Sequence, residues 1–216
     1  MMSGDRLKGF INSLYPENTE FLNRLEKEAL KDEIPIIRKD TQGLIRFLIS
    51  VKKPEKILEI GTAVGFSAIL MAEYSPHNTR IITIEDYEKR IPAAKENIEK
   101  AGFSDKIKLL EGDAAKLLPE IDESFDLIFI DAAKAQYPVY LSESKRLLNP
   151  GGFIIADNCL QGGDILESRY AVERRDRTIH KRMREFLKEI TSMKGFTSVL
   201  LPVGDGLAVA YRNEET

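Results

Sequence analysis

Acidic side chains close, or nearly close, the apolar runs that recur along the middle of this sequence. Five carboxylates do so: Glu59, Glu85, Glu111, Asp131 and Asp157. A single carboxylate in this position usually caps a helix or forms a turn. If the runs are parallel strands of one sheet, however, all five meet at the same edge. The negative charge gathered there would require a cationic ligand, a metal ion, or both.

Two of these carboxylates and an amide have the composition of a metal site. Asp131 lies in the stretch IDAAK, and Asp157 precedes Asn158 in the stretch ADN. Such oxygen donors from neighbouring strands suit Mg²⁺, Mn²⁺ or Ca²⁺. The alternative is that Asp157 and Asn158 only cap or turn the chain, but their occurrence together with Asp131 favours a metal. A single cysteine, Cys159, cannot build a thiolate cage.

Lys134 follows Asp131 by three residues. From there its ammonium group could face a substrate hydroxyl and take its proton or stabilise its anion. The alternative is an ordinary surface lysine. We expect a catalytic role.

The glycine loop between Gly61 and Gly65 indicates which nucleotide binds. It is not a G-x-G-x-x-G loop and has no P-loop lysine, which disfavours a pyrophosphate-binding dehydrogenase. Glu59, just before the loop, would repel a dinucleotide phosphate and suits an ammonium or sulfonium group. Glu85, some twenty residues after the loop, is placed to accept hydrogen bonds from ribose hydroxyls.

The order of elements predicts how these residues are positioned. Apolar runs at 56–60, 81–85, 107–111, 127–131 and 153–157 read as strands, with helices at 65–74, 88–101, 114–118 and 137–147 between them. This alternation predicts a parallel sheet covered on both faces. Residues 5–50 are helical, with Asp40 as a cap, and a helix near 176–192 precedes two final strands joined at Gly204–Gly206. We expect that pair to be antiparallel.

Length and composition indicate one ordinary globular domain. We divide the 216 residues into a helical preface (1–54), a cofactor- and metal-binding core (55–158), a basic insertion and helix (159–192) and a C-terminal hairpin (193–216). No stretch is apolar enough to cross a membrane, and the start lacks the apolar core of a signal peptide. We expect a cytoplasmic protein with no membrane partner.

A basic segment stands out against the overall formal charge of −3. Residues 168–184 carry seven basic side chains against two acidic ones, a net charge of +5: Arg169, Arg174, Arg175, Arg177, Lys181, Arg182 and Arg184. Most such runs are solvated helix faces, whereas the alternative is a surface that binds a phosphate-bearing partner.

The motifs LEIGTAVGFSA, DAAK, ADN and PVGDGLAVA resemble the metal-dependent class I S-adenosylmethionine O-methyltransferases related to the catechol and caffeoyl-coenzyme A enzymes. The resemblance implies a Rossmann-like α/β fold with a seven-stranded, mostly parallel sheet, an antiparallel C-terminal edge pair and an N-terminal helical preface. It implies Mg²⁺ or Mn²⁺ at Asp131, Asp157 and Asn158, with Lys134 as the active-site lysine. The implied cofactor residues are Ile37, Glu59, Gly61, Gly65, Ser67, Glu85, Asp113, Ala114 and Asp131.

The expected chemistry is displacement of a sulfonium methyl by a hydroxyl oxygen that has a second oxygen beside it, as in catechols and 5-hydroxyuridine. The basic segment favours RNA, and the chain is similar to the bacterial tRNA 5-hydroxyuridine methyltransferases of the family. We therefore expect methylation at the anticodon wobble position, with contacts to the anticodon arm from Arg174, Arg175, Arg177, Lys181 and Arg182. The alternatives are a small catechol or caffeoyl-coenzyme A acceptor and a non-catalytic scaffold. The resemblance also implies a homodimer.

Overall fold

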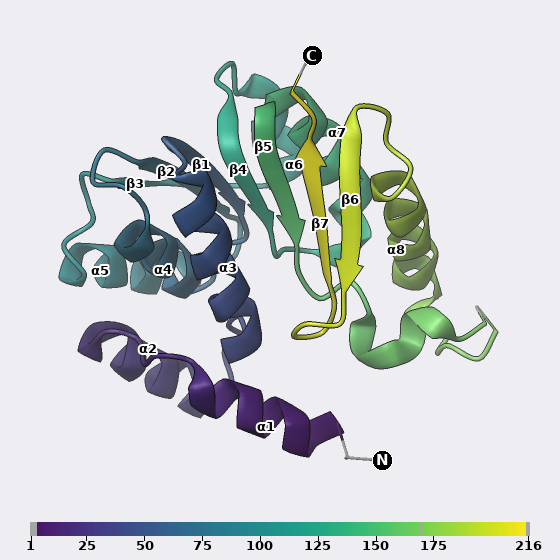
Figure 1. Cartoon of the computed structure of the whole chain (residues 1–216), viewed down its shortest axis with the longest axis horizontal. Coiled ribbons are helices and arrows are strands. Elements are labelled where there is room, and N and C mark those ends of the chain that lie inside the picture. Colours follow the sequence, from purple (N-terminus) through teal and green to yellow (C-terminus); the bar gives the residue numbers. More distant parts are fainter. Residues whose placement is uncertain (1–3, 169, 215–216) are drawn as a thin grey trace.

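The computed structural model describes residues 4–168 and 170–214 (Figure 1). The helices are α1 (Gly4–Leu14), α2 (Glu20–Lys31), α3 (Lys39–Lys52), α4 (Phe66–Tyr74), α5 (Ile91–Lys100), α6 (Ala114–Leu117), α7 (Tyr137–Leu147) and α8 (Arg177–Ile190), with 3-10 turns η1 (Leu118–Glu120), η2 (Lys134–Gln136) and η3 (Gln161–Leu166). The strands are β1 (Lys56–Ile60), β2 (Arg80–Glu85), β3 (Ile107–Glu111), β4 (Phe125–Ile130), β5 (Leu148–Ala156), β6 (Phe196–Leu201) and β7 (Leu207–Arg212).

The strands form one seven-stranded sheet in the order β3-β2-β1-β4-β5-β7-β6. Pairs from β3 through β5 are parallel, whereas β7 is antiparallel to both β5 and β6. The predicted α/β fold, with its antiparallel C-terminal pair, is confirmed. The strand order reverses between β1 and β4, and open α/β sheets bind ligands beyond the carboxyl ends of the strands at such a point.

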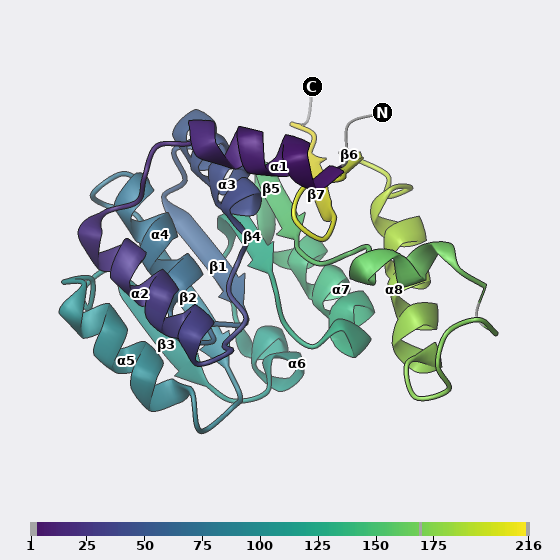
Figure 2. The same cartoon turned by 90° about the horizontal axis from the view of Figure 1, so that it is seen from below.

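Helices cover both faces of the sheet and enclose two apolar cores (Figure 2). One core lies against α2, α3 and α4, and the other lies against α7 and α8. Neighbouring strand residues serve opposite cores, since Ile57 belongs to the first and Leu58 to the second. The strands therefore read as continuous apolar runs, and each fully buried aliphatic side chain stabilises the fold by about 1.5–3 kcal/mol.

The helical preface is tied to the turn between β6 and β7. Helix α3 begins at Lys39, and its N-cap residue, Arg38, makes no side-chain cap. Asp40 lies inside the first turn, where its Oδ2 accepts the Gly204 N–H at 2.8 Å. The expectation that Asp40 caps the helix is therefore wrong, because this carboxylate instead joins the preface to the C-terminal hairpin.

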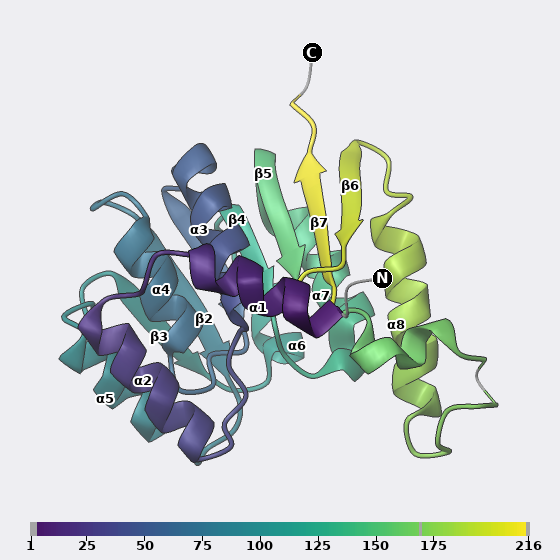
Figure 3. The same ribbon diagram turned by 60° about the horizontal axis from the view of Figure 1, so that its bottom comes forward.

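Helix α1 lies at the margin of the molecule and runs beside the same turn (Figure 3). Its four large apolar side chains, Leu7, Phe10, Ile11 and Leu14, are between 39% and 67% exposed. This helix therefore packs little of its apolar surface within the chain. Across the part of the chain that the structure describes, none of the helices has the length and apolar character needed to cross a membrane.

Candidate active site

A cavity of about 450 Å³ lies beyond the carboxyl ends of the central strands. The residues before α3 form one wall, and the ends of the five parallel strands with the loops that follow them form most of the rest. Nine of the predicted site residues line it: Ile37, Gly61, Ser67, Glu85, Ala114, Asp131, Lys134, Asp157 and Asn158. Glu59, Gly65 and Asp113 are not among the lining residues, and their contacts with a cofactor stay predictions.

The glycine loop needs both of its glycines for different reasons. Gly61 has φ +101° and Gly65 has φ +86°, a region that residues with a side chain rarely adopt. A Cβ on Gly61 would collide with the carbonyl oxygen of Asp131, so only glycine lets the loop pack against the end of β4. Gly65 donates its N–H to the carbonyl oxygen of Thr62 at 2.8 Å and is the N-cap residue of α4. Gly61 thus shapes the cavity, and Gly65 starts the helix behind it.

Glu85 fixes the glycine loop to the end of β2. Its Oε2 accepts the backbone N–H groups of Thr62 at 3.1 Å and Ala63 at 2.7 Å, and its Oε1 accepts that of Tyr87 at 3.0 Å. A carboxylate has about four lone-pair positions. The protein therefore uses three of them, and a ligand hydroxyl would find one more. The expected contact with ribose hydroxyls remains a prediction.

Glu59 is fully buried in β1, behind the cavity wall. Thr83 donates its hydroxyl to Oε2, whereas Oε1 makes no hydrogen bond of normal geometry. Burial raises the pKa of Glu59 to about 7, against the lowering effect of the Ser67 and Thr83 hydroxyls. The charges of Asp131 and Glu85 raise this pKa further. Because Ser67 lines the cavity and Glu59 does not, Glu59 would influence a ligand through Ser67.

Asp131, Asp157 and Asn158 lie together at the ends of β4 and β5. The parallel register pairs Ile130 of β4 with Ala156 of β5. Asp131 and Asp157 directly follow these two residues, so the register also places them beside each other. Asn158 donates its Nδ2 hydrogen to Asp131 Oδ1 at 2.9 Å, and its backbone N–H to Asp157 Oδ1 at 2.6 Å. All three side chains border the same part of the cavity.

The electrostatics of this group favour a cation. Burial raises the pKa of Asp131 and, together with the charge of Asp131, raises the pKa of Asp157 to about 7. The charge of Lys134 lowers both pKa values. Two buried carboxylates so close together resist joint ionisation unless positive charge is added.

The donor set fits a hard divalent ion. Within residues 4–168 and 170–214, no group of three or more His, Cys, Asp or Glu side chains is placed to hold a metal ion, and this group consists instead of two carboxylates and one amide. Oxygen ligands of this kind are those of Mg²⁺ and Mn²⁺. To bind a metal ion, the Asn158 amide would have to flip so that its oxygen takes the place of its nitrogen. The flip would break the hydrogen bond from Asn158 to Asp131.

Lys134 begins η2 and lines the cavity. Its Nζ lies 5.8 Å from the ring centroid of Tyr137, whose hydroxyl donates to the Asp157 carbonyl at 2.9 Å. Across the described chain, no carboxylate oxygen lies within ion-pair distance of Lys134. Its ammonium is therefore available to a ligand in the cavity.

The far end of the cavity is built around α6 and α7. Asp113 caps α6 by accepting the Ala115 N–H at 2.9 Å, while the next residue, Ala114, lines the cavity. Tyr140 of α7 also lines it, and burial together with the charges of Asp113 and Asp86 raises the pKa of Tyr140 to about 12. Asp113 thus orders this wall without forming part of it.

Several lining residues were missed by the sequence analysis: Arg38, Phe66, Asp86, Arg90 and Tyr140. Asp86 directly follows Glu85, so the rule that strand ends carry ligand-binding residues could have found it. Arg38 directly follows Ile37, which the resemblance implies is a cofactor residue. No comparable signal marks Tyr140, because its place in the wall depends on how α7 packs.

The basic segment occupies α8 and the loop before it, beyond the edge strand β6 (Figure 1). Arg169 lies outside the described residues. None of the five predicted RNA-contacting residues lines the cavity: Arg174, Arg175, Arg177, Lys181 and Arg182. Arg182 does reach its rim, because it donates to the carbonyl of Ala135 at 2.6 Å, next to Lys134.

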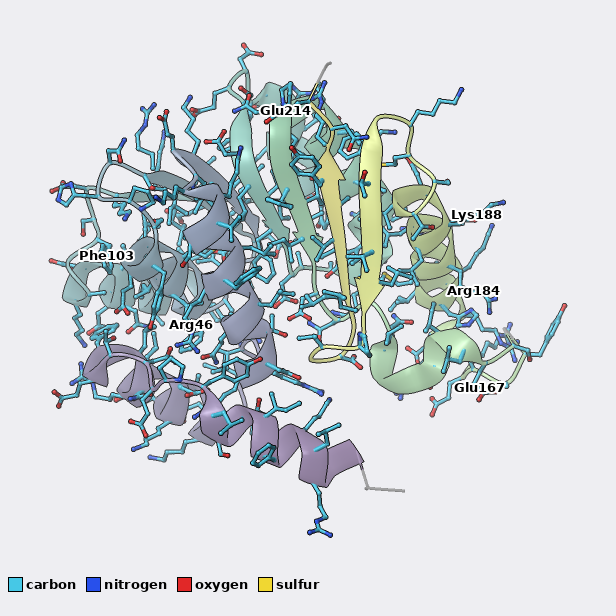
Figure 4. All side chains as sticks on the ribbon, in the orientation of Figure 1. Arg46, Phe103, Glu167, Arg184, Lys188 and Glu214 are labelled. Atoms are coloured by element: carbon cyan, nitrogen blue, oxygen red, sulfur yellow. The ribbon has the colours of Figure 1, made fainter. Side chains whose placement is uncertain are left out.

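Several cations of this segment have partners within it or directly beside it. Arg175 pairs with Glu173 and Asp176, and Lys181 pairs with Glu185. Arg177 donates to the carbonyls of Val172 and Tyr170. Arg184 reaches from α8 to the carbonyl of Glu167 on the facing segment, and both residues are labelled in Figure 4. These exposed pairs are weak and leave the segment's net positive charge in place.

The fold and the site together define a class of protein. The class is that of the Rossmann-like methyltransferases. Its features here are a seven-stranded sheet with this strand order, a glycine loop after β1 and acidic strand ends around one cavity. The model of the O-methyltransferase family matches residues 12–213. The chain therefore belongs to the O-methyltransferase family.

Curated relatives and solved structures agree with this assignment. A catechol O-methyltransferase of Niastella koreensis is 38% identical over 127 residues, which are 57% of this chain and 58% of the relative. A caffeoyl-CoA O-methyltransferase of Eucalyptus gunnii is 29% identical and covers 98% of this chain and 89% of its own length. The structure of a Bacillus cereus O-methyltransferase in complex with SAH is 25% identical, with a TM-score of 0.84 and coverage of 96% and 97%.

Proposed function

We propose that this chain is an enzyme that transfers a methyl group from S-adenosylmethionine to a hydroxyl oxygen. S-adenosylmethionine supplies an electrophilic methyl group on a sulfonium sulfur. The SAH bound to the Bacillus cereus relative supports this donor, as does a cavity that joins the glycine loop to two acidic strand ends. The proposal is carried by one observation: the cavity wall that contains Gly61, Ser67 and Glu85 continues into Asp131, Asp157 and Asn158.

Asp131, Asp157 and Asn158 would hold a divalent cation, Mg²⁺ or Mn²⁺. When bound, such an ion acts as a Lewis acid that lowers the pKa of an acceptor hydroxyl and orients it. The two carboxylates would then be ionised and directed at one point, and they would admit an acceptor with two adjacent oxygens. Tyr137 supports this arrangement from behind, through its hydrogen bond to the Asp157 backbone.

Lys134 would act on the acceptor hydroxyl. Lys134 lines the same cavity as Asp131, its charge lowers the pKa of Asp131, and its ammonium group is free of carboxylate partners in the described chain. In this position it would hold the acceptor oxygen by a charge-assisted hydrogen bond and stabilise the anion left when the hydroxyl proton passes to water. The oxygen would then bond to the methyl carbon as the carbon–sulfur bond breaks, and SAH would leave.

The acceptor has two candidates. A small catechol or a caffeoyl-coenzyme A type phenol is favoured by the names of the relatives. The second candidate is 5-hydroxyuridine at the tRNA wobble position, whose 5-hydroxyl lies beside a carbonyl oxygen. It is favoured by the basic segment, because Arg182 connects α8 to the loop of Lys134 at the cavity rim. A flipped-out base and a catechol would each present a hydroxyl with a second oxygen beside it.

One experiment distinguishes these acceptors. The purified chain, labelled S-adenosylmethionine and Mg²⁺ are incubated in parallel with a catechol panel and with total tRNA from a strain that lacks the gene. Label in the catechols alone supports the small-molecule candidate, and label in 5-methoxyuridine supports the tRNA candidate. No label in any pool, with the donor shown to bind, contradicts the proposed activity.

A further inference from the structure

Two cations from the helical preface converge on the carbonyl oxygen of Gly204, in the turn between β6 and β7. Lys8 of α1 donates to the carbonyl oxygen of Gly204 at 3.0 Å, and Arg38 donates to the same oxygen at 3.3 Å. Arg38 is exposed and lines the cavity. We propose that Arg38, assisted by Lys8, forms a binding subsite for an anionic group of the acceptor, a carboxylate or a phosphate. This inference rests on the proposed function and specifies its substrate class.

The position of Gly204 places this subsite next to the expected metal ligands. A Cβ built on Gly204 would lie 3.7 Å from Asp157 Oδ1, so the turn that binds both cations also borders that carboxylate. Asp40 holds the turn from the other side through the Gly204 N–H at 2.8 Å. An acceptor with its reacting hydroxyl at Asp157 would therefore extend past Gly204 toward Arg38.

The bonding of the two cations leaves them able to take an anion. Both donate to one neutral carbonyl oxygen, and in residues 4–168 and 170–214 neither has a carboxylate oxygen within ion-pair distance. Of the nearby carboxylates, Asp40 accepts the Gly204 N–H and Asp205 accepts the Gly162 N–H at 2.7 Å, and neither forms an ion pair with Arg38 or Lys8. A guanidinium has five donor hydrogens, so most of those on Arg38 remain free.

The chemistry of arginine selects the ligand class. Its planar donors match the paired oxygens of a carboxylate or phosphate, whereas a neutral catechol offers them nothing. The acceptor would therefore carry its negative charge a short distance from the hydroxyl to be methylated. An aromatic acid with adjacent hydroxyls would supply a carboxylate, and a polynucleotide would supply a phosphate. This subsite is separate from the basic segment, which adjoins the cavity at Ala135.

The test compares an anionic acceptor with a neutral one of the same ring. The KM and kcat for 3,4-dihydroxybenzoate, catechol and the tRNA pool are measured for the wild-type chain and for Arg38→Met, Lys8→Met and Lys39→Met. Lys39 is an exposed neighbour that does not line the cavity, so Lys39→Met controls for the loss of a charge. Unfolding temperatures exclude a general loss of structure.

Arg38→Met is expected to raise the KM for 3,4-dihydroxybenzoate about tenfold and leave the KM for catechol within about twofold, since a hydrogen bond between charged groups is lost only with the former. Lys8→Met has a smaller effect in the same direction, and Lys39→Met has none. Where tRNA is the acceptor, the same variants raise its KM and reduce its salt dependence, which identifies a phosphate.

Equal effects on 3,4-dihydroxybenzoate and catechol, or no effect on any acceptor, would overturn the subsite while leaving the methyl transfer intact. If the wild-type chain methylates nothing, the proposed function fails separately. Calorimetric titration of 3,4-dihydroxybenzoate into the wild-type chain and Arg38→Met then decides the subsite. Binding that is weakened about tenfold by Arg38→Met supports it, and equal binding or no binding contradicts it.

Discussion

Glu59→Gln is expected to stabilise the folded chain at alkaline pH and to have little effect at acidic pH. Glu59 is fully buried in β1, and burial raises its pKa from about 4.5 to about 7. A carboxyl whose pKa is higher in the folded chain binds its proton more tightly there than in the unfolded chain. The stabilising contribution is therefore complete below pH 4.5 and is lost as the pH rises to about 7.

The size of this effect follows from the two pKa values. Each factor of ten in proton affinity corresponds to about 1.4 kcal/mol, so the rise in pKa makes ionised Glu59 cost about 3 kcal/mol of unfolding free energy. The glutamine side chain of the variant would keep the shape of the protonated carboxyl at every pH, and its amide oxygen would still accept the Thr83 hydroxyl. The difference between the variant and the wild-type chain should therefore grow by about 3 kcal/mol between pH 4.5 and pH 8.

The assay is urea unfolding at several pH values, without the methyl donor and with metal removed. With an m value of about 2 kcal/mol/M, the expected change in midpoint difference is roughly 1.5 M. Glu28→Gln, which removes an exposed carboxylate of α2, is the control for the change in net charge. A stability difference for Glu59→Gln that does not vary with pH would refute the argument.

Three further predictions concern the loop, the lysine and the preface. Gly61→Ala should destabilise the chain by about 2 kcal/mol more than Gly102→Ala, because both glycines have positive φ but only a Cβ on Gly61 meets the Asp131 carbonyl; equal losses in thermal unfolding would contradict this. Lys134→Met should lower kcat by about 10²-fold or more and leave the affinity for the methyl donor nearly unchanged; an unaltered kcat would exclude the role given to Lys134. We also propose that the exposed apolar face of α1 packs against a second copy of the chain. The double variant Phe10→Glu, Leu14→Glu should therefore be monomeric in sedimentation equilibrium, whereas Leu30→Glu, at a similarly exposed leucine of α2, should still dimerise. A monomeric wild-type chain would exclude this dimer.

The sheet could be predicted from the sequence because its strands are buried on both faces. Residues such as Ile57 and Leu58 face opposite cores, so the strands read as short unbroken apolar runs between amphipathic helices. Asp131 and Asp157 could be expected near each other for the same reason, because each follows directly on one of two strands that would pair in parallel. Patterns local in the sequence were therefore sufficient to predict both the sheet and the closeness of these two carboxylates.

Features that depend on contacts distant in the sequence could not be predicted. Asp40 has the composition of a helix cap, but it bonds to Gly204, which is 164 residues away. Arg38 carries no motif and enters the site only because the preface folds against the C-terminal hairpin. Glu59 precedes the glycine loop as a ligand-binding residue would, yet the fold buries it fully and its carboxyl accepts the Thr83 hydroxyl within the sheet, so its contact with a cofactor stays a prediction.

The central claim is that Asp131, Asp157 and Asn158 hold one divalent ion beside the donor site, and Mn²⁺ binding followed by electron paramagnetic resonance tests it most directly. The wild-type chain should bind one Mn²⁺ per chain, with competition from Mg²⁺, and Asp157→Asn should weaken that binding by at least about tenfold. A wild-type chain that binds no Mn²⁺, or one whose binding is unaffected by both Asp131→Asn and Asp157→Asn, would contradict the account.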